Sequence, residues 1–456
     1  MNAKDPFTAP LAIGTDRQLF VDGYWIAANT GVRRQLHAPE KREIVLSPEK
    51  PWEMGGLSYL SAFEDEGKIR GWYRADPKSR DSDHNSITCY AESSDGINWR
   101  KPTLEQIEFA GSTHNNIVWV EPGINFAPFR DANPAAIPAE QYKAIIRDQS
   151  AILALASPDG IRWHLMRSQP ILTEGPFDSL NRPFWDTWRN EYVVYTRGVA
   201  GQGQGDFFDG VRWIRRATSA DFLNWSPLES IDCGDTPFEH FYTNSCIQYQ
   251  RAPGTYLMFP SRFVHERVPD PAWTYDTGVS DIVFMSSRDG LNFDRSFMEA
   301  FIRPGLDFGN WHDRGIYFEV GIVHTGDTEM SMYGMENAHL PTQRIRRYTL
   351  RTDGFVSLNA GYDGGECTTR PLIFSGGELE LNYSTSAVGS VRIEIQDVEG
   401  RPQPGFALRD CAEKYGDEIA GVMRWKGSGA LDALAGKPVQ LRFVLADADL
   451  YAFRFR

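Results

Sequence analysis

The stretch Ser93-Ser94-Asp95-Gly96-Ile97-Asn98-Trp99 contains the pattern that decides the fold, because versions of it return four more times along the chain. The related stretches begin at Ser157, Thr218, Ser286 and Arg351. From one copy to the next, the aspartates are separated by 64, 62, 68 and 64 residues. A nearly fixed period of this kind indicates that one structural unit is repeated around a ring or along an axis.

Each copy of the pattern is typical of a tight turn between two strands. The Asp side chain accepts hydrogen bonds from backbone N–H groups, and the Gly that follows adopts positive φ. The third copy has Phe222 where the others have Gly, which predicts a turn of another type. The role recurs in every unit, so we expect five structural aspartates: Asp95, Asp159, Asp221, Asp289 and Asp353. Five turn-locked units of about four strands each predict a five-bladed β-propeller.

The segments outside the repeat predict further structure. Residues 1–50 form an N-terminal segment whose apolar stretch, 18–26, is expected to pair with the last blade and close the ring. The five blades occupy residues 51–358. Residues 359–456 contain three alternating stretches that predict a small β-sandwich: 378–383, 390–395 and 439–445. The expected fold is therefore all-β, a five-bladed β-propeller followed by a C-terminal β-sandwich.

The composition excludes several classes of partner. Of the 456 residues, 41% are hydrophobic and 13% aromatic, which is ample for a packed core. The net charge is −14, and no long run of Lys and Arg occurs. Nucleic acids and anionic membranes both require clustered positive charge, so neither is an expected partner. A small neutral or cationic ligand remains compatible with the charge, and the oligomeric state is left open.

The cysteines and the N-terminus bear on localisation. The five cysteines are scattered without a Cys-x-x-Cys spacing, so neither a zinc site nor a disulfide framework is expected. The first ten residues lack the apolar core of a signal peptide, and no apolar run approaches about 18 residues. We expect a cytoplasmic protein, or a secreted or periplasmic one if a signal peptide has been removed.

Polar residues at the start of each blade are the candidates for a ligand site. The innermost strands of a propeller converge on an axial funnel that can hold a small polar ligand. Every blade begins with at least one carboxylate, usually beside an amide, imidazole, guanidinium or aromatic group. The residues expected to bind substrate are Glu53, Arg74, Asn181, His240, Tyr242, Asn244, His312 and Arg314.

This mixture of side chains is typical of sugar recognition, and the carboxylates could also cleave a glycoside. Glycoside hydrolysis needs two carboxyl groups of unequal pKa, one as acid and the other as base or nucleophile. We expect Asp178 and Glu239 to be this pair, with Asp131 and Glu319 in supporting roles. The prediction is a glycoside hydrolase that removes a terminal sugar from a small or branched glycan. Asp186 is expected to cap the turn at 185–188 instead.

Several of these motifs resemble known enzymes. The Ser-Asp-Gly-x-x-Trp turns resemble those of the five-bladed propeller glycoside hydrolases, the superfamily of arabinanases, β-xylosidases, invertases and levanases. The stretches 178–186, 242–244 and 346–355 are similar to a bacterial family described only as hydrolase-like. A propeller followed by a sandwich resembles the invertase branch. However, the invertase motif Trp-x-Asn-Asp-Pro-Asn is absent, and residues 130–134 only approach its Arg-Asp-Pro motif.

Two alternatives to hydrolysis remain open. A glycoside phosphorylase of related fold would need a cationic phosphate site, for which the sequence offers Arg74, Arg182, His312 and Arg314. A non-catalytic carbohydrate-binding propeller would be favoured if the nearest carboxylates in the funnel were more than about 10 Å apart.

No cofactor and no catalytic metal are expected. Related propellers sometimes hold an axial calcium ion, and an anionic funnel would attract cations. The nine histidines, however, show neither a His-x-His nor a His-Glu-x-x-His spacing. Carboxylates can perform the acid–base chemistry without a metal. Glu336, late in its blade, is expected to be peripheral.

Overall fold

The computed structural model describes residues 9–77, 86–200, 210–268, 277–426 and 430–456. This part of the chain consists mainly of β-strands with a few 3-10 turns, which confirms the all-β prediction. In the described ranges, no helix is long and apolar enough to cross a membrane.

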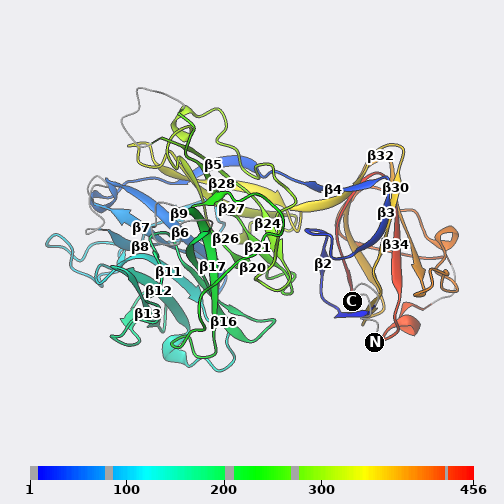
Figure 1. Ribbon diagram of the computed structural model, residues 1–456, viewed down its shortest axis with the longest axis horizontal. Helices are drawn as coiled ribbons and strands as arrows, with labels where there is room; N and C mark the ends of the chain where they lie inside the picture. Colours follow the sequence, from blue (N-terminus) through cyan, green and yellow to red (C-terminus); the bar gives the residue numbers. More distant parts are fainter. Residues whose placement is uncertain (1–8, 78–85, 201–209, 269–276, 427–429) are drawn as a thin grey trace. The chain divides into compact units, whose positions relative to one another are not determined.

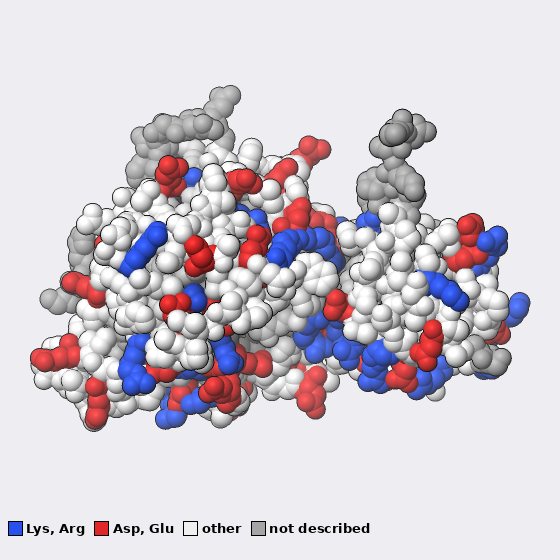
Figure 2. All heavy atoms as spheres, turned by 90° about the horizontal axis from the view of Figure 1, so that it is seen from below, with Lys and Arg blue, Asp and Glu red and all other residues white. Residues whose placement is uncertain are grey.

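The chain divides into two compact units. Unit 1 comprises Met1–Ala38, Gln250–Pro253 and Leu350–Arg456, and unit 2 comprises Pro39–Tyr249 and Gly254–Thr349. On the face drawn in Figure 2, acidic and basic side chains are intermixed. Many such charges form ion pairs, as Arg401 does with Asp397 and Glu399.

Unit 2 is built from antiparallel sheets that follow one another along the chain (Figure 1). Sheet 1 has the order β10-β8-β7-β6, with β9 on β8: β6 (Gly56–Asp65), β7 (Lys68–Asp76), β8 (Ile87–Ser93), β9 (Trp99–Arg100) and β10 (Ile117–Trp119). Sheet 2 has the order β11-β12-β13-β14: β11 (Ile124–Arg130), β12 (Tyr142–Asp148), β13 (Ala151–Ser157) and β14 (His164–Leu165). The 3-10 turns η1 (Pro51–Glu53) and η3 (Pro138–Glu140) lie beside these strands in the sequence.

Sheet 3 is continuous, whereas the fourth sheet is interrupted. Sheet 3 has the order β15-β16-β17-β18: β15 (Arg182–Asp186), β16 (Glu191–Ala200), β17 (Val211–Ser219) and β18 (Glu229–Ser230). Pro260 lacks an N–H and separates the two halves of the fourth sheet. One half is β19 (His240–Phe241), β22 (Ser261–Val264) and β23 (Val279–Ile282). The other is β20 (Ile247–Gln248), β21 (Tyr256–Met258), β24 (Met285–Ser287) and β25 (Phe293–Asp294).

Sheet 5 is completed by a strand from the N-terminal side of the chain. It contains β26 (Ile316–His324), β27 (Glu329–Glu336), β28 (Arg344–Arg351) and β5 (Glu40–Leu46), preceded by the turn η4 (Phe308–Asn310). β5 pairs antiparallel with β28, from Ile345–Leu46 to Thr349–Glu40 (Figure 1). β26 in turn pairs with β6 at Val320–Ser61, so the last sheet adjoins the first.

The prediction that residues 18–26 close the ring is wrong. β2 (Gln18–Leu19) pairs with β34 in unit 1, where Phe20 and Trp25 are buried among apolar side chains. The strand that joins sheet 5 is β5, which begins with four exposed charged residues, 40–43. An outermost strand is partly solvated and carries charges for that reason, so an apolar stretch is not the signal for it.

Unit 1 combines both ends of the chain in one sheet. Its order is β3-β30-β34-β29-β4, with β2 and β32 also on β34 and β33 on β32. A separate two-stranded sheet pairs β1 parallel to β31. The strands are β1 (Leu11–Gly14), β3 (Ile26–Thr30), β4 (Val32–Leu36), β29 (Val356–Ala360), β30 (Gly365–Thr369), β31 (Leu372–Phe374), β32 (Leu379–Gln396), β33 (Asp417–Val422) and β34 (Gln440–Phe455). The turns η5 (Leu408–Asp410) and η6 (Leu431–Leu434) connect them. The predicted strands 378–383 and 390–395 are the two halves of one long strand, β32, whose register shifts between them.

Four of the five repeated turns have the expected hydrogen bonds. The Oδ1 atom of Asp159 accepts from the N–H groups of Ile161 and Arg162, at 2.9 and 2.8 Å. Asp95, Asp221 and Asp289 do the same. At the fifth turn, in unit 1, the Asp353 carboxylate accepts from the Arg251 guanidinium at 2.8 and 3.0 Å.

The prediction of a different turn type at Phe222 is also wrong. Phe222 takes the positive φ of the missing glycine, at 67°, and Asp221 makes the same two backbone bonds. Left-handed backbone costs a bulky residue roughly 1–3 kcal/mol. The Phe222 ring is buried against Phe129 and Tyr192, at centroid distances of 5.6 and 5.2 Å. Burial of an aromatic side chain contributes about as much as the strain costs.

The turns also connect neighbouring sheets. Trp72 of sheet 1 donates to the carbonyl of Gly160 in the turn of sheet 2, at 2.7 Å. Tyr195 of sheet 3 donates to Gly290 in the turn of the fourth sheet. Tyr333 of sheet 5 donates to Gly96 in the turn of sheet 1, at 2.8 Å. Each turn carbonyl is thus held by the preceding sheet, and the last of these bonds joins sheet 5 to sheet 1.

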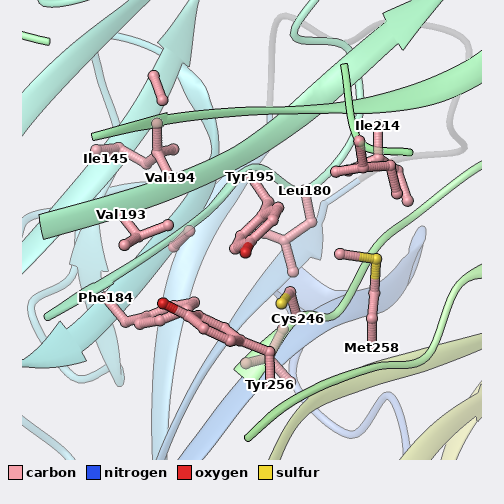
Figure 3. Close-up of a cluster of buried hydrophobic side chains, with 14 of the residues drawn as sticks. Ile145, Leu180, Phe184, Val193, Val194, Tyr195, Ile214, Cys246, Tyr256 and Met258 are labelled. Carbon is pink, nitrogen blue, oxygen red and sulfur yellow. The ribbon is translucent and has the colours of Figure 1, made fainter. Parts of the chain in front are cut away.

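The largest apolar cluster of unit 2 lies between its middle sheets. Figure 3 shows side chains from three sheets in contact, including Ile145 of β12, Val194 of β16 and Met258 of β21. These residues are buried, and their packing holds the sheets face to face.

Asp159→Ala should lower the free energy of unfolding of unit 2 by about 1–2 kcal/mol, because two backbone N–H groups lose their acceptor. Urea unfolding followed by tryptophan fluorescence measures this change. Asp327→Ala, at an exposed loop aspartate, is the control and should be close to neutral. Equal stability of both variants would contradict a structural role for the turn.

Candidate active site

The backbone is irregular in or before the first strands of the sheets, and the candidate site is built there. Residues with positive φ lie in or beside these strands: Tyr59, Asn125, Phe177, Ser245 and Gly321. Register shifts accompany them in β6, β11 and β26. Such breaks redirect side chains, and strained residues of this kind gather at functional sites.

Asp178 is the partly exposed carboxylate of this region. It follows the strained Phe177, and its loop is held by Asn181, whose side-chain amide donates to the carbonyls of Phe177 and Ser179 at 3.1 Å. The Asp178 side chain is 29% exposed, and its Oδ2 accepts from Arg197 at 3.0 Å. Its Oδ1 is buried and accepts no hydrogen bond from the residues that the structure describes. A carboxylate oxygen left in this way is suited to a ligand.

Arg197 connects Asp178 to Tyr242. It lies in β16, with a fully buried side chain. One guanidinium nitrogen donates to Asp178, and another donates to the backbone carbonyl of Tyr242 at 2.5 Å. The sequence prediction took its candidates mainly from the starts of the blades, with Arg74 as an exception, and Arg197 was missed for that reason.

Tyr242 is surrounded by cations and stacks on another tyrosine. Its ring lies 5.4 Å from that of Tyr317, nearly parallel to it. The guanidinium carbons of Arg197, Arg314 and Arg212 lie 4.2, 5.3 and 5.8 Å from the ring centroid. Burial would raise the pKa of the Tyr242 phenol, but Arg197 and Arg314 outweigh burial and lower it.

Asp313 is a second carboxylate attached to this cluster. Arg314 donates to both of its oxygens, at 2.5–2.9 Å, and also donates to the Tyr242 hydroxyl at 3.1 Å. The Asp313 side chain is 5% exposed and that of Arg314 is 25% exposed. Asp313 precedes the predicted Arg314 directly, and this adjacency of opposite charges is the signal that could have identified it.

His240 borders the cluster through Arg212. The backbone N–H of Arg212 donates to the Nδ1 atom of His240, at 3.2 Å. Burial, together with the charges of Arg212 and His265, lowers the pKa of His240, so the imidazole is neutral at pH 7. A neutral imidazole can accept or donate a hydrogen bond to a ligand.

Glu239 lies in a cavity next to His240. Its oxygens accept from Arg262 at 2.8 Å and from Arg295 at 3.1 Å, and its side chain is 14% exposed. The cavity has a volume of about 1130 Å³. Its walls combine charged residues with the exposed aromatic side chains of Phe238 and Trp311. Two guanidinium groups bind the oxygens of Glu239, whereas Asp178 has a single guanidinium partner among the described residues.

Asp131 belongs to a repeated contact between sheets. Its Oδ2 accepts from the Tyr192 hydroxyl of the next sheet at 2.7 Å and from Lys143 at 2.5 Å. Two equivalent aspartates at the ends of first strands also accept from a tyrosine of the next sheet: Asp65 from Tyr142, and Asp186 from Tyr256. These contacts give Asp131 a structural role and do not support a catalytic one. Asp186 additionally accepts from the N–H groups of Trp188 and Arg189, which confirms the predicted cap.

The remaining predicted residues are buried. Glu53 accepts from the Tyr73 hydroxyl and from Lys101, and Arg74 donates to Asp76 and Asn125, so both are held by structural bonds. Four others are almost completely buried: Asn244, Glu319, His312 and Arg182. Burial lowers the pKa of His312, and lowers that of Arg182 to about 10. Such burial argues against the phosphate site that the sequence suggested at Arg182 and His312.

Within the described ranges, no group of three or more His, Cys, Asp or Glu side chains is placed to hold a metal ion. The expectation of metal-free catalysis stays a prediction.

The sequence matches no protein-family model and no curated protein. Several similar solved structures are described as glycoside hydrolases or glycosidases, and another is an N-acetylgalactosamine deacetylase from F. plautii. A glycoside hydrolase with 14% identity covers 69% of this chain and 92% of its own, at a TM-score of 0.46. A member of the mannoside phosphorylase family, in which some hydrolases target β-1,2 mannosidic linkages in Candida mannan, has 17% identity, covers 69% and 94%, and has a TM-score of 0.43. A fructofuranosidase from Schwanniomyces occidentalis, complexed with fructosylnystose, has 10% identity, covers 90% and 96%, and has a TM-score of 0.42. Similarity at this level leaves the reaction to be argued from the side chains.

Proposed function

We propose that this protein is a glycoside hydrolase that removes a terminal sugar from a small or branched glycan. The five sheets of unit 2 would form the blades of a propeller, with unit 1 as a β-sandwich. The observation that carries the proposal is Asp178, a partly exposed carboxylate with one oxygen fixed by Arg197 and the other without a described partner. Its surroundings, two stacked tyrosines and several guanidinium groups, suit a sugar ring and its hydroxyls.

The two carboxylates of the Tyr242 cluster suit different steps of glycoside cleavage. Asp178 has a partly exposed side chain and suits the role of the acid that protonates the leaving oxygen in glycosidases. Asp313 has both oxygens bound by Arg314 and suits the role of charge stabiliser. In this proposal Asp313 replaces Glu239 as the partner of Asp178. Glu239, Trp311 and Phe238 would instead bind a further part of the glycan in the adjoining cavity.

A panel of aryl glycosides and natural oligosaccharides tests the proposed function. We expect release of a single terminal sugar from at least one member of the panel, detected as free reducing sugar. If the protein binds members of the panel and hydrolyses none of them, a carbohydrate-binding protein without activity becomes the better interpretation.

A further inference from the structure

Within the described ranges, the cations around the Tyr242 ring outnumber the carboxylates paired with them. Arg197 forms an ion pair with Asp178, and Arg314 forms one with Asp313. Arg212, the third cation beside the ring, forms no ion pair with any residue in the described ranges. Its Nε atom is buried and has no hydrogen-bond partner among those residues. Among the residues that the structure describes, the cluster therefore contains one guanidinium group without an ion-pair partner of its own.

The environment of Arg212 is unfavourable for an isolated cation. Its guanidinium lies 5.8 Å from the ring centroid of Tyr242 and 5.6 Å from that of Phe263, so it is partly removed from water. Burial, followed by repulsion from Arg197, lowers the pKa of Arg212. The neighbouring His240 is neutral and offers no compensation. Half-buried charges normally have a partner, and a bound anion would supply one.

We infer that Arg212 binds an oxyanion at the Tyr242 cluster, next to Asp178. A guanidinium group binds a carboxylate or a phosphate through two parallel hydrogen bonds, so both sources fit the same chemistry. The first source is the carboxylate of an acidic sugar, such as a uronic acid, in the substrate. The second is inorganic phosphate acting in place of water. The identity of the substrate rests on the proposed function, whereas binding of the anion does not.

The phosphate source implies a balanced reaction of its own. A phosphate oxygen would form a bond to the anomeric carbon while the glycosidic carbon–oxygen bond breaks. The leaving oxygen would take its proton from Asp178, and the product would be a sugar phosphate. If the anion is instead the carboxylate of a uronic acid, the reaction remains hydrolysis, and Arg212 binds the carboxylate of the sugar.

Equilibrium binding measurements test the inference. The probes are inorganic phosphate, glucuronate and galacturonate, with glucose and galactose as neutral counterparts. We expect the wild type to bind at least one anion, and Arg212→Gln to weaken that binding at least about tenfold. Arg212→Lys keeps the positive charge and should retain part of the anion binding. It serves as a second variant if Arg212→Gln does not fold.

Arg215→Gln is the matched control. Arg215 lies on the same strand, β17, and is also partly buried, but its guanidinium donates to the carbonyl of Glu174. This variant should bind the anion as the wild type does. Preference for a uronate over its neutral counterpart identifies an acidic sugar, and phosphate binding with phosphate-dependent turnover identifies a phosphorylase.

The inference is overturned if the wild type binds no anion more tightly than the neutral sugars, or if Arg212→Gln binds the anion unchanged. Neither result affects the proposed glycoside cleavage, which depends on Asp178 and is tested separately.

Discussion

Asp178→Asn is expected to lower kcat about 100- to 10,000-fold on glycosides with poor leaving groups, because the amide cannot protonate the departing oxygen. Glycosides with good leaving groups, such as dinitrophenyl glycosides, need little protonation. Their turnover should fall much less. Steady-state kinetics over a series of leaving groups measures this difference directly.

The comparison of leaving groups separates an acid from a residue that only shapes the site. A uniform loss over the whole series would assign Asp178 to binding or positioning, and wild-type rates would exclude it from the reaction. Asp235→Asn replaces an exposed aspartate shortly before Glu239 and is the control. Thermal unfolding of both variants shows whether the fold is retained.

Glu336→Gln should lower the free energy of unfolding of unit 2 by about 3 kcal/mol at pH 7, the cost of removing one partner from a buried ion-pair network. Glu336 was expected to be peripheral, but it is fully buried. Its carboxylate accepts from Lys41 of β5, from Arg344 and Arg346 of β28, and from the Tyr348 hydroxyl. The variant removes the negative charge that these three cations of β5 and β28 share.

The effect of Glu336→Gln should depend on pH. Burial acts to raise the pKa of Glu336, but Lys41 and Arg346 outweigh it and lower the pKa below the ordinary value of 4.5. The stabilisation is therefore complete above pH 4.5 and is lost as the pH falls through the lowered pKa. Chemical unfolding at pH 7 and at pH 3 should show the difference between variant and wild type shrinking in acid. Glu49→Gln, at an exposed carboxylate 3.8 Å from Lys101, should have little effect at either pH. A constant difference at both pH values would contradict the role of the charge.

The repeated turns could be predicted from the sequence because their hydrogen bonds are local. Asp95 or Asp159 bonds to residues two and three positions ahead, so spacing alone defines the contact. The backbone of Phe222 could not be predicted in this way. Its positive φ depends on burial against Phe129 and Tyr192, which are distant in sequence.

The candidate site was only partly predictable for the same reason. The search at the starts of the blades identified Asp178, Tyr242 and Arg314, and the structure connects them around one ring. Arg197 and Arg212 come from middle strands of sheet 3 and reach the ring of Tyr242 only because this sheet packs beside the fourth one. Residue type alone also cannot distinguish Asp131, which bonds to the next sheet, from Asp178, which keeps an oxygen without a described partner.

The sheet of unit 1 has a consequence for the order in which the protein can be made. Its strand β4 pairs with β29, so Leu36 meets Val356, a residue 320 positions later in the chain. During synthesis on the ribosome, the first strands of unit 1 therefore have no pairing partner until almost all of unit 2 has been made. Closing so long a loop is less costly once the intervening chain is already compact. In sequence, unit 2 is inserted between the two parts of unit 1. Co-translational folding would therefore complete unit 2 before unit 1.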